Sequence, residues 1–101
     1  MAVDLSIGVA VEKIRDRSNI ALFGCGDDGK RALAALRNAG IAVSWFCDNN
    51  PALWGKPVGG VKVLSPRQLR EMDATVIIAT SRYYGEIKAQ LSDLGITAVN
   101  A

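Results

Sequence analysis

The chain has 101 residues, with 12 lysines and arginines against 10 aspartates and glutamates, for a formal net charge of +2. Half of the residues are hydrophobic and 22% are charged, which is typical of one globular domain and excludes disordered, collagenous and coiled-coil chains. The near balance of charge leaves no basic stripe for nucleic acid, and no apolar run approaches the roughly 20 residues that a membrane span needs. Without a secretory leader or a C-x-x-C pair, we expect a cytoplasmic protein with two reduced cysteines.

The first 17 residues form an ambiguous segment, because their apolar positions fit both a strand and one face of a helix. We expect an N-terminal helix or arm over 1–17, followed by a βαβ core over 18–101 of a single domain. Within the core, Asn19–Phe23 is a short apolar run that predicts the central strand. The helical spacing over Lys30–Ala39 predicts a helix that ends at Gly40, and Ile41–Cys47 predicts the second strand.

The second half continues the alternation of strands and helices. Its predicted elements are a loop at 48–60, a strand at 61–64, a short helix from Ser65 to near Met72, a buried strand at 74–79, a helix from Tyr84 to Leu94 and a last strand at 96–99. This alternation predicts the α/β class, as a minimal Rossmann-like three-layer fold: an open, mostly parallel sheet of about five strands with helices on both faces. Ligands of such sheets bind beyond the carboxyl ends of the strands.

A glycine motif lies at that place, between the first strand and the first helix. Residues 24–29 match G-x-G-x-x-G, and Asp48 follows 19 residues after Gly29, at the end of the second strand. Glycines permit the turn and the approach of a pyrophosphate, and an acid after the second strand accepts hydrogen bonds from a ribose. Asn49 and Asn50 stand where an arginine would hold a 2′-phosphate, which favours NAD over NADP. The candidate cofactor-binding residues are Gly24, Cys25, Gly26, Asp27, Asp28, Gly29, Asp48, Asn49, Thr80 and Ser81.

The same residues also have a structural interpretation. Glycines are needed at this turn in any βαβ unit, and Asp27 and Asp28 favour a helix start but would repel a diphosphate. Thr80, Ser81 and Arg82 fit a helix cap as well as a contact to phosphate or sugar. Nucleotide binding and an empty structural turn therefore both stay open.

Other chemistry finds little support in the sequence. The chain has no histidine, so we predict no metal site and no catalytic residue. The string Gly24 to Lys30 spells G-x-x-x-x-G-K, but Arg31 replaces the hydroxyl residue that a P-loop needs. Tyr84 and Lys88 resemble the Y-x-x-x-K pair of short-chain dehydrogenases, although the apolar spacing around Tyr84 favours a core position.

Several motifs together resemble a known domain type. They are Gly24–Lys30, Trp45–Pro51, Trp54-Gly55, Gly59–Val61, Val63–Pro66 and Tyr83–Leu91. The chain resembles the small Rossmann-like domain associated with FkbM-type methyltransferases, glycosyltransferases and bacterial sugar-modifying enzymes, and more distantly the N-terminal domain of bacterial sugar acyltransferases. This resemblance implies a module of a larger polysaccharide biosynthesis protein, with a UDP-sugar held by Gly24, Gly26, Gly29 and Asp48.

We therefore predict a domain that binds a nucleotide or nucleotide-sugar, with NAD or a UDP-sugar as candidate ligands, and that is not catalytic on its own. The alternative is a non-catalytic interaction or oligomerisation module that keeps the fold without a ligand. Its contact surfaces would be the Trp54 loop and the N-terminal segment. Either a homodimer or a partner domain in a longer chain fits these predictions.

Overall fold

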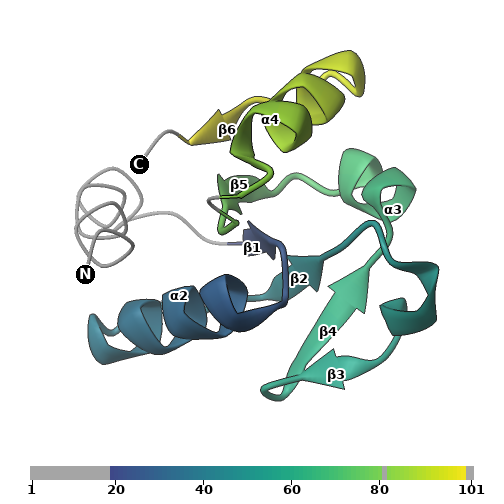
Figure 1. The fold of residues 1–101 in the computed structure, drawn as a ribbon. Helices are drawn as coiled ribbons and strands as arrows, with labels where there is room; N and C mark the ends of the chain where they lie inside the picture. The colour runs from purple at the N-terminus through teal and green to yellow at the C-terminus, as the bar shows by residue number, and fades with distance from the viewer. Residues whose placement is uncertain (1–18, 81, 100–101) are drawn as a thin grey trace.

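The computed structural model describes residues 19–80 and 82–99, in which strands and helices alternate (Figure 1). The elements in chain order are β1 (Ile20–Phe23), α2 (Asp27–Asn38), β2 (Trp45–Cys47), the 3-10 helix η1 (Pro51–Leu53), β3 (Pro57–Val58), β4 (Val61–Leu64), α3 (Pro66–Glu71), β5 (Thr75–Ile78), α4 (Tyr84–Asp93) and β6 (Ala98–Val99). The helix or arm expected over residues 1–17 lies outside the described residues. Among the described residues, no helix has both the length and the hydrophobicity to cross a membrane.

The strands form one sheet in the order β3-β4-β2-β1-β5-β6. Strands β4, β2, β1, β5 and β6 are mutually parallel, while β3 runs antiparallel to β4. The predicted α/β class is confirmed, and the sheet is mixed. β1 is central as expected, since Leu22 pairs with Phe46 of β2 on one side and Ile77 of β5 on the other. The chain adds strands on one side of β1 and then returns to add β5 and β6 on the other.

The prediction of a plain loop at 48–60 is wrong, because this segment contains η1 and the edge strand β3. Gly59 and Gly60 both have positive φ, at +58° and +79°, as a two-residue hairpin turn requires. This turn pairs Val58 with Val61, so the predicted strand at 61–64 gains an antiparallel neighbour. Arg37 of α2 also donates to the Gly59 carbonyl oxygen at 2.9 Å, which ties the hairpin to the helix.

The two faces of the sheet carry separate cores, as alternation of side chains along a strand requires. Ile20 and Leu22 of β1 pack with Ala32, Leu33 and Leu36 of α2 on one face. Ala21 and Phe23 pack on the opposite face, in a cluster that also contains Leu69 of α3 and Ile87 and Leu91 of α4. The helices thus cover both faces, with α2 on one side and α3 and α4 on the other (Figure 1).

The second strand is shorter than the apolar run Ile41–Cys47 predicted, because the first four residues of that run connect the end of α2 to the sheet. Gly40 takes the left-handed conformation expected after a helix, with φ +78°. The Ile41 N–H then returns to the Leu36 carbonyl oxygen at 2.9 Å, and the Ser44 N–H reaches the Ile20 carbonyl oxygen at 2.8 Å. These bonds bring the chain to the sheet, where β2 begins only at Trp45.

The predicted start of the second helix is confirmed. Ser65 accepts a hydrogen bond from the Gln68 N–H at 3.1 Å, and the Gln68 side chain accepts from the Ser65 N–H at 2.9 Å. This reciprocal pair is a capping box, with Pro66 in the first helical turn. The cap fixes α3 directly after β4, and Leu69 of α3 packs against Cys47 of β2 and the β1 residues on the same face.

Candidate functional site

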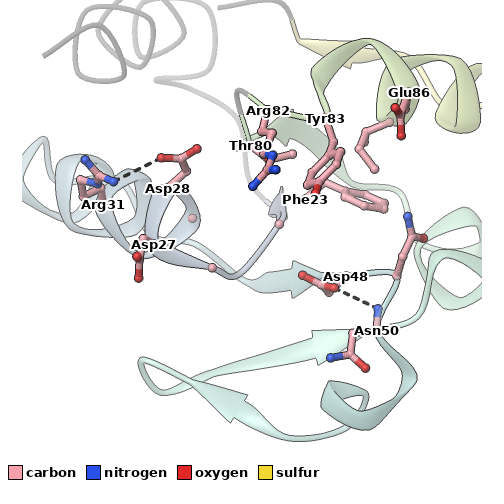
Figure 2. A pocket seen from close by; sticks show the side chains of 15 residues that line it. Phe23, Asp27, Asp28, Arg31, Asp48, Asn50, Thr80, Arg82, Tyr83 and Glu86 are labelled. Carbon is pink, nitrogen blue, oxygen red and sulfur yellow. Dashed lines mark hydrogen bonds and ion pairs between the residues drawn. The ribbon is translucent and has the colours of Figure 1, made fainter.

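A cleft of about 700 Å³ opens at the carboxyl ends of the strands, beside the point where the strand order reverses. Three segments surround it: the loop between β1 and α2, the residues after β2, and the segment from β5 into α4 (Figure 2). The lining residues are Phe23, Gly24, Gly26, Asp27, Asp28, Gly29, Arg31, Asp48, Asn49, Asn50, Thr80, Arg82, Tyr83, Glu86 and Ile87. Eight of the ten candidate residues are among them; Cys25 is not, and Ser81 lies outside the described residues.

Each of the three glycines of the motif has a different local role. Gly24 has φ +106°, which favours glycine, and its N–H donates to the Cys47 carbonyl oxygen at 2.7 Å. A Cβ on Gly29 would collide with the Gly24 carbonyl group and lie 3.2 Å from the Phe46 ring. A Cβ on Gly26 would meet no atom within 4 Å. Gly24 and Gly29 therefore serve the turn and the packing, while Gly26 leaves open space over the loop.

The N-terminus of α2 points its backbone donors at this loop. Gly26 is the N-cap, without a side-chain cap, and the first intrahelical bond runs from the Lys30 N–H to the Gly26 carbonyl oxygen at 2.9 Å. The N–H groups of the first turn have no acceptor within the helix, which suits an anion. Asp28 forms an ion pair with Arg31 at 3.3 Å, and the Asp27 side chain is exposed.

Asp48 lies opposite the glycine loop, at the end of β2, and its carboxylate is held on both oxygens. Oδ2 accepts from the backbone N–H of Cys25 at 3.2 Å and from the Cys25 thiol at 3.3 Å. Oδ1 accepts from the Asn50 N–H at 2.9 Å (Figure 2). The Asp48 carbonyl oxygen accepts from the Trp54 indole at 2.7 Å. The loops after β1 and β2 are thus joined through this one carboxylate, which stays half-buried.

Asn49 takes a structural position that its prediction as a cofactor residue did not include. Its side-chain amide makes two reciprocal hydrogen bonds with the Gln90 amide of α4, at 2.8 and 2.7 Å. The next residue, Asn50, accepts from the Ala52 N–H at 3.1 Å and so caps η1. The pair between Asn49 and Gln90 connects the segment after β2 to α4.

The wall that follows β5 and opens α4 contains Thr80 and Arg82, which the sequence prediction included, and Tyr83 and Glu86, which it missed. Thr80 lies against Gly24, with 3.5 Å between its Cβ and a Cβ built on Gly24, and the cap of α4 receives no side-chain bond. The Arg82 guanidinium lies 5.5 Å from the centre of the Tyr83 ring, and Tyr83 is 48% exposed. Glu86 completes this wall in the first turn of α4. The sequence signal that could have identified the missed residues was their position. They lie where the chain enters α4, directly after a strand whose end borders the cleft.

The cleft is acidic. Asp27, Asp28, Asp48 and Glu86 line it against two arginines, Arg31 and Arg82. Among the described residues, no group of three or more histidines, cysteines, aspartates or glutamates could hold a metal ion.

Both cysteines are free and buried. Burial raises the pKa of the Cys25 thiol to about 12, and its hydrogen bond with Asp48 and the charge of that carboxylate add to the shift. Burial also raises the pKa of Cys47 to about 12, together with the charge of Asp48. Both groups therefore stay protonated at neutral pH.

Two features that the sequence singled out do not line the cleft. Tyr84 is half-buried and packs against the core on the α4 face, and Lys88 is exposed. The expected core position of Tyr84 is confirmed, and the resemblance to a dehydrogenase pair concerns spacing alone. Trp54 is 40% exposed, yet its indole N–H is engaged by the Asp48 carbonyl oxygen.

Comparisons with known proteins found one matching family model and similar solved structures. A family model described as C2185-like, N-terminal, matches residues 16–100. No curated protein matches the chain significantly. Among solved structures, the chain is similar to a crystal structure of RSP, a Rex-family repressor, with a TM-score of 0.58 and 16% sequence identity. The match covers 87% of this chain and 46% of the repressor, so the chain spans less than half of that protein's length. At this identity the similarity concerns the fold alone.

These findings correct the resemblance to domains of FkbM-type methyltransferases, glycosyltransferases, sugar-modifying enzymes and sugar acyltransferases, which is wrong. The physical reason lies in the motifs that carried it. Gly24 and Gly29 are required by the turn and by the contact between helix and strand, so a chain of another family that builds this turn needs them too. The assignment of a UDP-sugar to Gly24, Gly26, Gly29 and Asp48 therefore loses the support of those relatives.

Proposed function

The chain belongs to the C2185-like N-terminal family, and from the geometry of its cleft we propose that it binds a nucleotide there. The diphosphate lies over Gly26 at the N-terminus of α2, and the ribose diol lies on Asp48. The ligand is a dinucleotide such as NAD or a nucleoside diphosphate-sugar.

The observation that carries this proposal is the open space over Gly26 opposite a fixed carboxylate. A Cβ on Gly26 would meet nothing within 4 Å, so neither turn nor packing requires a glycine there. Asp48 stands across the same cleft with its carboxylate oriented by Cys25 and Asn50. A diphosphate needs close approach to backbone N–H groups, and a ribose needs an acceptor after the second strand.

The arrangement of the sheet supports the proposal as well. The five parallel strands follow the order of a Rossmann-like fold, with β1 in the centre and the chain reversing between β1 and β5. In this fold type, ligands bind outside the carboxyl ends of the strands at the reversal point. The cleft lies at that point, since Gly24 after β1 and Thr80 after β5 both line it.

The charge of the cleft limits which nucleotide fits. Asp27 and Asp28 stand near the proposed diphosphate, and Arg31 offsets only Asp28. Affinity therefore depends mainly on the ribose and base, and a 2′-phosphate next to Asp48 is disfavoured. Because the Asn49 amide is paired with Gln90, only its second N–H is left for such a phosphate. NAD should bind more tightly than NADP.

Thermal unfolding with and without ligand tests the proposal. The purified chain is heated with NAD, NADP, UDP-glucose or GDP-mannose, and a ligand present at about 100 times its Kd should add roughly 2.7 kcal/mol to the free energy of unfolding. Asp48→Asn keeps the size of the side chain but weakens acceptance from the diol, so the shift should fall at least severalfold. Asp73→Asn removes an exposed carboxylate that does not line the cleft, and it should leave the shift unchanged.

Two results would contradict the proposal. The first is the absence of a shift with every nucleotide, which would favour the interaction module instead. The second is an equal shift in Asp48→Asn and in the wild type, because the ribose would then lie elsewhere.

A further inference from the structure

The Asp48 carboxylate is nearly saturated with hydrogen bonds before a ligand arrives. Oδ2 accepts two bonds from Cys25, through the backbone N–H and the thiol, and Oδ1 accepts one from the Asn50 N–H. An ionised carboxylate offers about four acceptor positions. One position, on Oδ1, is therefore open to a ligand.

A ribose cis-diol brings two hydroxyl donors, so one of the three present donors has to leave. The Cys25 N–H belongs to a buried residue of the glycine loop, and a buried N–H without an acceptor is costly. The Asn50 N–H belongs to the turn that leads into η1. The thiol is a weak donor and can turn away by rotation about a single side-chain bond. Of the three donors, the thiol is the cheapest to displace.

We infer that the Cys25 thiol is a placeholder on Asp48 that yields its position to the second hydroxyl of a ribose diol, and that it thereby sets the affinity of the cleft for the diol. This inference rests on the proposed function. It gives a role to a motif residue that does not line the cleft and is only 5% exposed, so Cys25 is a positioning residue that acts through Asp48.

The protonation state of the thiol agrees with this role. Burial, the hydrogen bond to Asp48 and the charge of that carboxylate together raise the Cys25 pKa to about 12. The sulfur thus keeps its proton at neutral pH and donates to Oδ2. A thiolate at this place would instead repel Asp48.

Calorimetric titration of three variants tests the inference, with NAD and UDP-glucose as probes. Cys25→Ala removes the competing donor and should tighten binding about threefold, since S–H is a weak donor. Cys25→Ser introduces a stronger donor to a carboxylate and should weaken binding roughly tenfold. Cys47→Ala is the matched control, because it removes a buried thiol beside Asp48 in the chain that gives the carboxylate no hydrogen bond. Its Kd should equal that of the wild type.

A single-hydroxyl probe distinguishes displacement from a general packing effect. The 2′-deoxyribose analogues of NAD and UDP-glucose need only the open position on Oδ1, so the difference between alanine and serine at position 25 should disappear. Should Cys25→Ala fail to fold, as its ligand-free unfolding temperature would show, Cys25→Ser with both forms of the probe carries the test.

The outcomes separate the inference from the proposed function. Equal Kd values for the wild type, Cys25→Ala and Cys25→Ser, or the same order of affinities with the deoxyribose analogues, would overturn the placeholder while nucleotide binding stands. No binding of either probe by any of the proteins would overturn both.

Discussion

Replacing Gly29 with alanine should destabilise the chain, whereas the same replacement at Gly85 should stabilise it. Both glycines lie in the first turn of a helix, Gly29 in α2 and Gly85 in α4. A Cβ on Gly29 would fall 2.8 Å from the carbonyl carbon of Gly24, and nearer still to its oxygen, whereas a Cβ on Gly85 meets no atom within 4 Å. The two sites therefore differ strongly in the space that a Cβ would find.

The magnitude follows from opposing contributions. Overpacking costs about 1–3 kcal/mol, and the upper end applies at Gly29 because the obstacle is backbone that no rotamer change can move. Alanine recovers about 0.5–1 kcal/mol of helix propensity at either site. The net loss at Gly29 is about 2 kcal/mol, or a fall in Tm of roughly 8–16 °C, while Gly85→Ala should gain about 0.5 kcal/mol, or roughly 2–4 °C.

Circular dichroism followed during heating and during urea unfolding measures both variants. A Tm of Gly29→Ala equal to or above that of the wild type would refute the close packing of α2 on the glycine loop. A loss at Gly85 as large as that at Gly29 would refute the steric explanation too, since it would show a general intolerance of alanine at helix starts.

Three further predictions concern the cleft. Asp27→Asn should tighten diphosphate binding up to about fivefold, because one carboxylate near the helix N-terminus is worth about 0.3–1 kcal/mol; titration at low salt measures it, and weaker binding would contradict it. The pKa of Cys25 and of Cys47 is raised from 9.0 to about 12, so their contribution to stability is complete below pH 9 and is lost between pH 9 and 12. The free energy of unfolding, measured in urea, should then fall with rising pH in that window by up to about 1.4 kcal/mol per pH unit for each thiol. In Cys47→Ala the fall should be smaller, because one of the two thiols is missing. Asn49→Ala and Gln90→Ala should each cost about 1 kcal/mol and couple by at least 0.5 kcal/mol in a double-mutant cycle; additive effects would mean that the amide pair contributes nothing.

The helices and parallel strands could be predicted because each follows from local pattern. Strand β1 is a short apolar run buried on both faces, and Gly40 stands where a helix end needs a left-handed residue. Edge strand β3 was missed since two residues, one of them a proline, carry no period, although Gly59-Gly60 is a hairpin signal. The length of β2 was overestimated because apolar character does not reveal that the Ile41 N–H caps α2.

The candidate site was predictable where the backbone determines it and less so where side chains do. The glycine loop and Asp48 follow from the βαβ unit, whose strand ends must lie at one edge of the sheet. The bonds that join Cys25 to Asp48, and Asn49 to Gln90, connect residues 23 and 41 positions apart. Such contacts depend on the rotamers and the distance between loops, which spacing in the sequence does not specify. The motif could not identify the family because the turn and the helix–strand contact require Gly24 and Gly29 in any chain that builds them.

Gly26 is the position at which the demands of the fold and of the ligand separate. Gly24 and Gly29 are required by φ and by packing whether or not a ligand is bound, so they say nothing about binding. Gly26 has an extended backbone with φ −78°, which alanine also adopts, and open space where its Cβ would stand. The free energy of unfolding of Gly26→Ala should therefore lie within about 1 kcal/mol of the wild-type value, because the only change is that alanine is a poorer N-cap than glycine.

The same methyl group would occupy the place where a diphosphate approaches the loop, so Gly26→Ala should lose the nucleotide-induced shift in Tm. If the variant is stable and still binds the nucleotide, the diphosphate does not lie over this loop. One that is as unstable as Gly29→Ala would show that Gly26 is needed for the turn. Only the combination of retained stability and lost binding makes the glycine loop a binding element rather than a structural one.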